Sequence, residues 1–486
     1  MIFSSIPFLY YFLPVVLVLY FALTRRRPAS AAAGESRGMI RTASFGGNLV
    51  LLFASLFFYG WGEPRYLVMI GIAIVSAWTL GLLIPKPGMI GRLAFWLSVT
   101  VSLGLLGWFK YADFFVESFA AVTGMEVEGL GIALPIGISF YTFQILSYTI
   151  DVHRGRIAPQ RNLVNFAMYV ALFPQLIAGP IVVYSRVEQQ LDPSRRMVSA
   201  ACLYEGASRF LIGLSKKVFL ANQLGELVSL FGGLNSEKSV VFYWMYAVAF
   251  SLQIYFDFSG YSDMAIGLGR MFGFDFPENF NYPFLSKSIT EFWRRWHMTL
   301  GGWFREYVYI PLGGNRVSAG RWVLNLFVVW GLTGLWHGAA WTFVIWGLYH
   351  GALLLLEKFV LGKILSKAPA FVSRAYVLVL VIVSMVIFNA ASMGEALEYI
   401  SGMFGVGKIA FMSSLTGYYL RSYGLLFLLA IIGSTPVVKT AAGKVRAKLN
   451  AAALDFVEPL ILAGLLILVT AYLVDGSFNP FLYFRF

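Results

Sequence analysis

Repeated apolar runs of about 20 residues restrict the fold of this chain more than any other feature of its sequence. A helix of that length crosses a hydrocarbon core of about 30 Å, so each run is long enough to span a membrane. Membrane barrels are built instead from short segments of alternating hydrophobicity. The sequence therefore predicts an all-α, polytopic membrane protein. The clearest early runs are 6–24, 48–59 with its flanks, 66–84, 93–109, 130–150 and 240–256.

The composition agrees with this class of protein. Hydrophobic residues make up 59% of the chain and charged residues only 13%, whereas soluble domains are about 45–50% apolar and about 25% charged. The net charge of +13 comes from short basic loops between apolar runs. The positive-inside bias predicts such loops, so the charge does not indicate a nucleic-acid partner. The single cysteine, Cys202, leaves no intrachain disulfide and no CxxC metal site.

The order of the charges predicts how the chain is oriented. The first run precedes Arg25, Arg26 and Arg27, so it is interpreted as a first span and not as a cleavable signal peptide. Basic loops alternate with an acidic loop at 113–128 through five spans, which places the N-terminus outside. We expect about ten to twelve spans in one transmembrane domain. The later spans are expected at 322–336, 341–355, 375–390, 422–433 and 459–473, with a basic loop at 439–448.

The middle of the chain departs from this regular pattern. Residues 163–183 are apolar but contain Pro174 and Pro180, which predict a kinked or re-entrant segment. Residues 201–232 mix apolar residues with lysines, as in a partly interfacial helix. From Asp257 to Arg316 no run is long enough to span, and polar backbone of this length normally lines a protein-enclosed cavity.

Three of the four histidines lie between residues 253 and 351, and ionisable residues at membrane depth usually mark function. They are His297, His337 and His350. His337 lies in LTGLWHGAAW, where small residues leave room for the close approach of a backbone or a substrate and Trp336 forms a rigid wall. A neutral imidazole there can accept a proton from a hydroxyl nucleophile. The alternative is a packing histidine between helices that the small residues bring close together.

His297 lies in EFWRRWHMTLGGW. On a helix, Trp293 and Arg294 would share a face with His297, and this face could receive an anionic or carbonyl-bearing ligand. The alternative is an interfacial helix anchored by its tryptophan and arginine side chains. His350, in WGLYHG, is interpreted as a packing histidine.

Other reaction classes find little support in the motifs. The chain has no phosphate-binding loop, HExxH, EF-hand or GxSxG motif in its proper context, and two histidines without a third ligand make zinc a weak hypothesis. Asp257 and Asp263 are six residues apart, which leaves glycoside chemistry by a carboxylate pair open. The last six residues, FLYFRF, suit an interfacial aromatic belt. Alternatively they form a short tail that folds back into a cavity, where the phenol of Tyr483 carries an acyl group.

Six segments carry a resemblance to a known family. They are FYTFQILSYTIDVHRG (140–155), FPQLIAGPIV (173–182), FDFSGYSDMAIGLGRMFGF (256–274), FNYPF (280–284), FWRRWHMTLGGWFREYVYIPLGGNR (292–316) and GLWHGAAWTFVIWG (334–347). Together they resemble the membrane-bound O-acyltransferase family, and more closely its bacterial polysaccharide branch, which includes the alginate O-acetyltransferase membrane subunit. The similarity covers essentially the whole chain, 1–486.

The resemblance implies a fold and a site. The fold would be a ring of helices around a central tunnel, with re-entrant or interfacial helices and a catalytic core at about 130–350. His337 matches the essential histidine of the family, and His297 matches its second polar position. No permanently bound cofactor and no metal are expected. The tunnel is expected to contain Gln144, Gln175, Asp257, Asp263, Trp293, Arg294 and Trp336.

The resemblance also implies a donor, an acceptor and partners. Acetyl-CoA would approach from the cytoplasm, and the acetyl group would pass to an exported polysaccharide, with alginate first and cellulose or peptidoglycan as alternatives. A periplasmic SGNH or esterase-like subunit would complete the transfer outside the bacterial inner membrane. The tail 481–486 resembles the aromatic tail of a small partner protein in teichoic-acid D-alanylation. A transporter or channel lined by histidines and broken helices is the alternative from another class, and a long-chain acyltransferase is the alternative within the enzymes.

Overall fold

The computed structural model describes residues 1–26, 41–234, 238–476 and 481–482. Within these ranges, eight helices are long and apolar enough to cross a membrane, and the apolar helix Pro7–Ala22 is shorter. The polytopic, helical fold is therefore confirmed. The eight are fewer than the expected about ten to twelve spans, because several expected runs form short, broken or less apolar helices. The eight helices long and apolar enough to cross a membrane are Phe45–Gly62, Pro64–Leu83, Met89–Thr123, Val240–Met271, Trp341–Lys367, Ala370–Asn389, Ser414–Gly433 and Ala452–Asp475.

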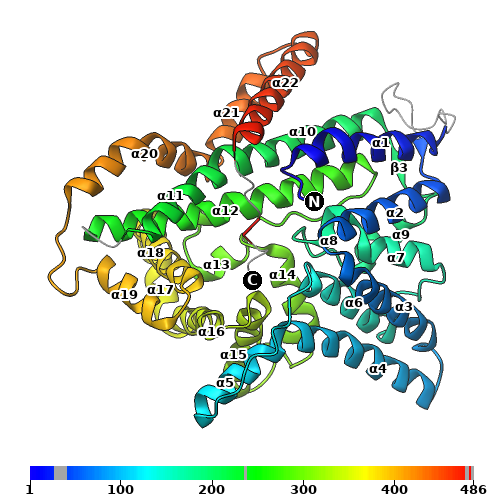
Figure 1. Ribbon diagram of the computed structural model, residues 1–486, viewed down its shortest axis with the longest axis horizontal. Helices are drawn as coiled ribbons and strands as arrows, with labels where there is room; N and C mark the ends of the chain where they lie inside the picture. The colour runs from blue at the N-terminus through cyan, green and yellow to red at the C-terminus, as the bar shows by residue number, and fades with distance from the viewer. Residues whose placement is uncertain (27–40, 235–237, 477–480, 483–486) are drawn as a thin grey trace. The chain divides into compact units, whose positions relative to one another are not determined.

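Residues Met1–Ile212 and Tyr261–Glu278 form a first compact unit, called unit 1. Its elements are η1 (Pro7–Phe12), α1 (Leu13–Ala22), β1 (Arg25–Arg26), β2 (Arg41–Thr42), α2 (Phe45–Gly62), α3 (Leu67–Leu83), α4 (Met89–Leu106), α5 (Ala112–Thr123), α6 (Ile138–His153), α7 (Leu163–Ala171), α8 (Phe173–Leu176), α9 (Tyr184–Leu191) and β3 (Met197–Val198). Helix α4 packs beside α3 and α6, and α7 packs beside α2 (Figure 1). The three short strands form an antiparallel sheet in the order β1-β2-β3.

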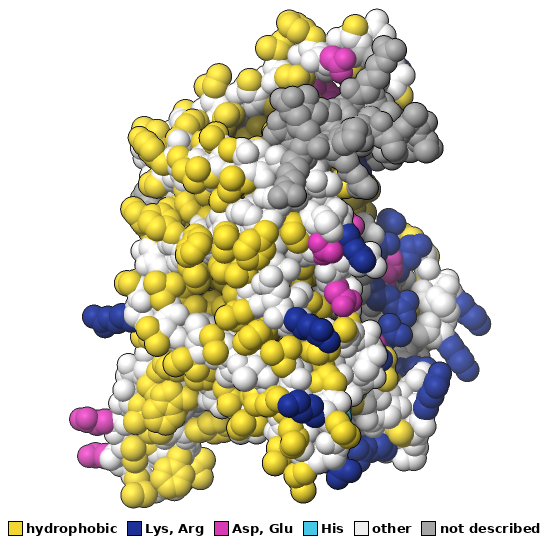
Figure 2. Space-filling model, turned by 90° about the vertical axis from the view of Figure 1, so that its right-hand side faces the viewer, with side chains coloured by type: hydrophobic (Ala, Val, Ile, Leu, Met, Phe, Trp, Pro, Cys, Tyr) yellow, Lys and Arg dark blue, Asp and Glu magenta, His cyan; other side chains and the backbone are white. Residues whose placement is uncertain are grey.

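Large hydrophobic side chains are exposed along α2, α3 and α4. Phe53, Val68 and Trp96 are 65%, 71% and 64% exposed. Soluble monomers rarely expose large contiguous apolar patches, whereas lipid tails are as apolar as these side chains. Figure 2 shows hydrophobic side chains over much of the face in view, with Lys and Arg gathered toward one side. This surface is that of a protein embedded in lipid.

The apolar segment 163–183 is broken, as predicted. Helix α7 ends at Ala171, Leu172 has an extended ψ of 112°, and α8 is a single turn. Pro174 lies in the first turn of α8, where its missing N–H costs no helical hydrogen bond. The backbone N–H of Phe173 donates to Ser55 Oγ at 3.0 Å. A side chain from α2 therefore satisfies the interrupted backbone.

Two helices, α10 (Ala200–Ser215) and α12 (Val240–Met271), contribute residues to both units. Helix α12 continues past Asp257 to Met271, so the prediction that the non-helical polar segment begins at Asp257 was wrong. Asp257 pairs with Lys217, and Asp263, on the same helix, pairs with Arg209. A paired carboxylate is far less costly to bury than an unpaired one. These partners lie far away in the sequence, so the pattern around Asp257 could not reveal them.

The acidic loop expected at 113–128 is partly helical. Helix α5 continues the helix of α4 through the π-helical turn η3 (Gly107–Tyr111), and it contains Asp113. The carboxylate of Asp113 accepts hydrogen bonds from the backbone N–H groups of Leu130 and Ile132. Asp113 therefore fixes the returning chain, and the next helix begins only at Ile138, whereas the sequence predicted a span from Leu130.

Residues Gly213–Gly260 and Asn279–Phe486 form the second compact unit, called unit 2. Its elements are η4 (Lys216–Ala221), α11 (Asn222–Gly232), η5 (Pro283–Leu285), α13 (Ile289–Trp293), α14 (Met298–Phe304), η6 (Arg305–Tyr309), α15 (Ala319–His337), α16 (Trp341–Leu356), η7 (Glu357–Leu361), α17 (Gly362–Lys367), α18 (Ala370–Asn389), α19 (Met393–Met403), α20 (Ser414–Gly433), α21 (Val437–Arg446) and α22 (Ala451–Asp475). The expected basic loop at 439–448 is thus mostly helix α21, with Lys444 in its last turn, where a cation suits the helix dipole.

Helices α15 and α16 form a tightly packed antiparallel pair (Figure 1). A Cβ atom on Gly334 would clash with the carbonyl oxygen of Phe343, and one on Gly347 would clash with that of Trp330. A Cβ atom on Gly338 would clash with the ring of Phe343. The glycines near His337 therefore allow close packing of helices, as small residues do in membranes. The room for a substrate that the sequence suggested at these glycines is filled by protein.

Candidate active site

Two buried histidines lie next to each other in unit 2. The ring centroids of His297 and His337 are 6.3 Å apart, and the residues are 1% and 3% exposed. Trp336 packs against both imidazoles, with centroid separations of 5.8 Å to His297 and 5.2 Å to His337. Sequence analysis selected all three residues, and the fold brings them together across 40 positions of the chain.

His337 is the last residue of α15, and aromatic rings hold its imidazole from several sides. Trp346 and Phe388 meet it edge to face, with centroids at 5.1 Å and 5.4 Å. The next residue, Gly338, is extended and begins the turn into α16. The imidazole is thus fixed at the carbonyl end of a helix, in a wall of aromatic side chains.

His297 does not lie on a helix face with Trp293 and Arg294, so that prediction was wrong. Helix α13 ends at Trp293, and His297 precedes α14 with left-handed backbone angles, φ 43° and ψ 53°. Such a conformation costs about 1–3 kcal/mol in a residue other than glycine and is concentrated at functional sites. The backbone N–H of the next residue, Met298, donates to the carbonyl oxygen of Asn279 at 3.0 Å. This hydrogen bond helps to hold the turn.

The side chain of Asn279 fixes the tautomer of His297. Asn279 Oδ1 accepts hydrogen bonds from the backbone N–H of Thr299 at 3.3 Å and from Thr299 Oγ1 at 2.9 Å. It lies 3.1 Å from His297 Nδ1. Since an amide oxygen can only accept, we assign the imidazole proton to Nδ1, and Nε2 carries the lone pair. Burial lowers the pKa of His297 to about 3, so the ring is neutral at physiological pH.

His297 Nε2 is the chemically available atom of this imidazole. It is buried, and no residue in the described part of the chain hydrogen-bonds to it. Buried polar atoms without a partner are rare and often belong to functional sites. Sequence analysis missed Asn279, which lies 18 residues before His297. Its only signal was its place directly before the FNYPF segment.

Trp293 and Arg294 turn away from the imidazole of His297. The indole N–H of Trp293 donates to His350 Nδ1 at 3.2 Å, and the Trp293 ring packs on Trp330 with centroids 4.6 Å apart. Arg294 is exposed. His350 is fully buried and packs among these rings, but its Nε2 has no hydrogen-bond partner among the described residues, so the interpretation as a packing histidine stays a prediction.

Asp257 connects the site region to the end of the chain. Its Oδ1 is 2.6 Å from Lys217 Nζ, and its Oδ2 accepts the backbone N–H of Leu482 at 2.8 Å. The next residue of α12, Phe258, packs edge to face on His297 with centroids 4.6 Å apart. The predicted acyl carrier Tyr483 lies outside the described residues.

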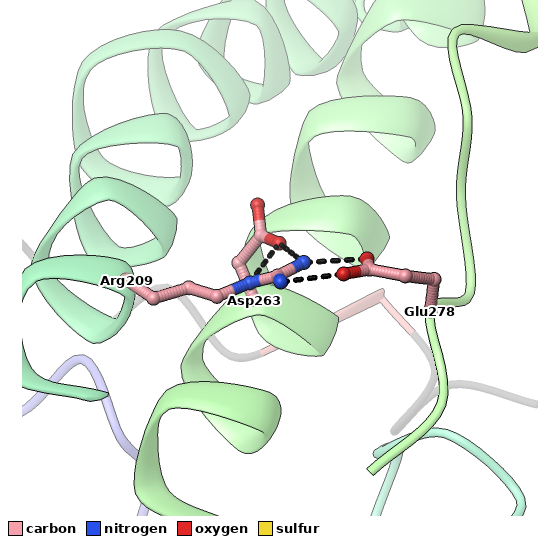
Figure 3. A network of polar contacts seen from close by, with 3 residues as sticks. All are labelled: Arg209, Asp263 and Glu278. Atoms are coloured by element: carbon pink, nitrogen blue, oxygen red, sulfur yellow. Dashed lines mark hydrogen bonds and ion pairs between the residues drawn. The ribbon is translucent and has the colours of Figure 1, made fainter. Parts of the chain in front are cut away.

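Asp263 belongs to an ion network in unit 1 (Figure 3). Its Oδ1 accepts hydrogen bonds from Arg209 Nε at 3.1 Å and Nη2 at 2.8 Å, and the same guanidinium binds both oxygens of Glu278. Six residues apart on one helix, Asp257 and Asp263 point about 120° apart around the axis. The structure does not join them in a carboxylate pair of the kind that glycoside chemistry uses.

Gln144 and Gln175 are buried in unit 1, each 1% exposed. Gln175 Nε2 donates to the carbonyl oxygen of Tyr169 at 2.6 Å. The Oε1 atoms of both side chains accept no hydrogen bond from the residues that the structure describes. Amide oxygens of this kind can bind the N–H or O–H groups of a polar ligand.

The fold and the site describe an integral membrane protein with a buried pair of neighbouring histidines. The model of the membrane-bound O-acyltransferase family matches residues 138–393, which include both histidines. The chain belongs to this family and is an acyltransferase of the membrane, which argues against the transporter alternative.

Individual relatives extend the similarity beyond the matched segment. The chain is 39% identical to the probable alginate O-acetylase AlgI of Pseudomonas putida over 518 residues, with 100% of both chains covered. It is 43% identical to that of Pseudomonas aeruginosa over 418 residues, covering 84% of this chain and 75% of the relative. It is 33% identical to the peptidoglycan O-acetyltransferase of Helicobacter pylori over 440 residues, covering 84% and 81%.

Proposed function

We propose that this acyltransferase takes an acetyl group from cytoplasmic acetyl-CoA and passes it across a bacterial inner membrane for O-acetylation of an exported polysaccharide. The buried pair of His297 and His337 carries the proposal, because it offers one imidazole to move a proton and another to hold a hydroxyl. Alginate is the first candidate, since the probable alginate O-acetylase of Pseudomonas putida is similar along the whole chain. Cellulose and peptidoglycan are the alternative acceptors.

His337 acts as the general base. As the hydroxyl oxygen of the nucleophile bonds to the thioester carbonyl carbon, the hydroxyl proton moves to His337. The tetrahedral intermediate then breaks its carbon–sulfur bond. The CoA thiolate takes the proton from His337, which returns the imidazole to its neutral form.

His297 orients the nucleophile. Its pKa of about 3 makes it too weak a base to take a proton near neutral pH, because an effective base has a pKa close to the working pH. Its Nε2 lone pair can still accept a hydrogen bond from the nucleophile hydroxyl. We assign no oxyanion-stabilising role to His297 or Arg294, since neutral Nε2 has no hydrogen to donate and Arg294 is exposed.

The indole N–H of Trp346 is our candidate for the oxyanion donor. Trp346 is 1% exposed, and its Nε1 has no acceptor within the described ranges. Its ring lies 5.1 Å from that of His337. An indole nitrogen can only donate, and one donor to a developing oxyanion lowers the barrier by about 3–4 kcal/mol.

Tyr483 is the immediate nucleophile in this proposal. It follows Leu482, whose backbone N–H is bound by Asp257 on α12. The acetyl-tyrosine then passes the group to an SGNH or esterase-like subunit in the periplasm, which acetylates the polymer. On the cytoplasmic side, the basic loops attract the phosphates of acetyl-CoA.

The test uses the purified protein in lipid nanodiscs with radiolabelled acetyl-CoA. Release of CoA and transfer of label are measured for the unsubstituted protein, for His337→Ala and for His297→Ala. We expect His337→Ala to be nearly inactive and His297→Ala to be severely impaired, while His153→Gln, at the exposed last residue of α6, retains full activity. Retained transfer in His337→Ala would overturn the assignment of the base. Intact-mass analysis of Tyr483→Phe tests the tyrosine separately, because protein-bound label that persists in this variant contradicts the relay.

A further inference from the structure

We infer that Lys217 and Asp257 form a docking site for the C-terminal tail of this same chain, and so act as positioning residues for Tyr483. The inference rests on the proposed role of Tyr483. It is carried by described residues alone, because Phe481 and Leu482 are seated on the site in the structure.

The carboxylate of Asp257 is shared between a side chain and the tail backbone. Oδ1 pairs with Lys217 Nζ at 2.6 Å, and Oδ2 accepts the N–H of Leu482 at 2.8 Å. Both members of the ion pair are buried, Lys217 at 4% and Asp257 at 1% exposure. A backbone N–H bound to an ionised carboxylate makes a strong, directional hydrogen bond, so this contact defines the position of Leu482.

A buried ion pair needs a reason beyond stability. Removing two charges from water costs about as much as their attraction returns, and apolar replacements are often neutral or stabilising. Asp257 contacts Lys217 through Oδ1 and accepts the tail N–H through Oδ2. The pair therefore binds the backbone N–H of the tail, which two apolar side chains of the same volume could not do.

Apolar contacts continue the docking site toward the histidines. Phe481 is 3% exposed and Leu482 is 6% exposed. The ring of Phe481 lies 5.9 Å from that of Phe258, and Phe258 packs on His297 at 4.6 Å. Two consecutive residues of α12 thus hold the tail: the carboxylate of Asp257 binds the backbone N–H of Leu482, and the ring of Phe258 packs on that of Phe481. Phe258 therefore contacts both the tail and His297.

The spacing along the chain gives the docking site its function. The residue after Leu482 is Tyr483, and one trans peptide unit separates their Cα atoms by about 3.8 Å. Fixing Leu482 therefore limits the volume that the phenol of Tyr483 can search. Holding a nucleophile near its reaction geometry removes much of the entropic cost of the reaction, so the pair should act on kcat rather than on the binding of acetyl-CoA.

The test compares two double variants in the full-length protein in nanodiscs. Lys217→Met with Asp257→Leu removes both charges together and leaves neither one unpaired. Lys217→Gln with Asp257→Asn keeps an oxygen that can accept the Leu482 N–H, and it serves as the conservative rescue. The matched control removes an exposed ion pair of unit 1, Glu205→Gln with Arg270→Gln.

Two readouts follow each variant. The first is the rate at which carboxypeptidase or trypsin shortens the tail, which contains Arg485, measured by intact mass. We expect the tail of the apolar double variant to be shortened about ten-fold faster or more than that of the unsubstituted protein. The rate should rise less in the amide variant, and the control should have the rate of the unsubstituted protein. The second is acetyl transfer, where kcat should fall about ten-fold or more with KM for acetyl-CoA unchanged.

The tail readout decides the inference, whatever the nucleophile proves to be. Equal rates of tail shortening in the apolar variant and the unsubstituted protein would overturn the docking site. A fall in kcat with a matching rise in KM would overturn the positioning role, since it would indicate a damaged donor site. Persistence of label in Tyr483→Phe would instead contradict the proposed relay and would leave the tail readout intact.

Discussion

Replacing Asn279 by leucine should disable the site without touching either histidine. Leucine has nearly the shape of asparagine but offers no acceptor to His297 Nδ1, which Asn279 Oδ1 now meets at 3.1 Å. A buried N–H left without a partner costs about 1–3 kcal/mol. When the nucleophile is bound, the imidazole avoids this cost by moving its proton to Nε2, where the oxygen of the nucleophile hydroxyl can accept it. That change places a donor where the unsubstituted protein presents a lone pair.

The size of the effect follows from the tautomer balance. A preference of about 1–3 kcal/mol for the wrong tautomer lowers the fraction of the reactive one by about 5- to 150-fold, at about 1.4 kcal/mol for each factor of ten. We expect kcat for acetyl transfer to fall within this range. KM for acetyl-CoA should change little, because the acceptor atom serves the nucleophile.

The assay is initial-rate acetyl transfer in nanodiscs at saturating acetyl-CoA, with Thr299→Val as the matched control. This control removes the hydroxyl that donates to Asn279 Oδ1 at 2.9 Å, and it leaves the contact between Asn279 and His297 in place. We expect it to lose less than about five-fold in kcat. Full activity in Asn279→Leu, together with an inactive His297→Ala, would refute the reasoning on the tautomer.

Three further predictions follow from contacts of the site and of unit 1. Asn279→Asp places a carboxylate beside Nδ1–H and raises the pKa of His297 from its lowered value. As the pH is lowered, this variant should therefore lose activity at a higher pH than the unsubstituted protein. Superimposable pH–rate profiles of kcat for the two proteins would contradict this. Trp346→Phe keeps the ring but removes the proposed oxyanion donor, so kcat should fall about 10²–10³-fold, whereas an unchanged kcat would exclude the indole N–H. Arg209→Met removes the cation that Asp263 and Glu278 share, so its melting temperature in detergent should be several degrees below that of the unsubstituted protein. Glu278→Gln should lower the melting temperature less, because the side chain of Glu278 is half exposed. Equal melting temperatures for Arg209→Met and the unsubstituted protein would show that the network contributes no stability.

The helices that cross the membrane could be predicted because the membrane leaves few choices. Every backbone polar group in a bilayer must be satisfied internally, so a long apolar run is a helix. The run expected at 66–84 is α3, Leu67–Leu83, and those expected at 341–355 and 375–390 are α16 and α18. Here the pattern of hydrophobicity alone determines the element, and the ends agree within a few residues.

The polar positions could not be predicted in the same way, because their partners are distant in sequence. The helix through Asp257 depends on Lys217, 40 residues earlier. His297 was placed on a helix with Trp293, but α13 ends at Trp293 and the chain enters a left-handed turn. That turn depends on hydrogen bonds to Asn279. The importance of His297 was visible in the sequence, whereas the geometry that determines its role was not.

The two histidines are not interchangeable, and their surroundings explain why. His297 precedes the first residue of α14, and Asn279 accepts the first two N–H groups of that helix, those of Met298 and Thr299. His337 is the last residue of α15, at the end where unpaired carbonyl groups create negative potential. Burial lowers the pKa of His297 to about 3, so this ring stays neutral and can only accept a hydrogen bond at Nε2. His337, whose ring centroid is 6.3 Å away, is then the base of the proposed mechanism. A hydroxyl held between the two rings should lose its proton to His337 and keep its hydrogen-bond geometry through His297.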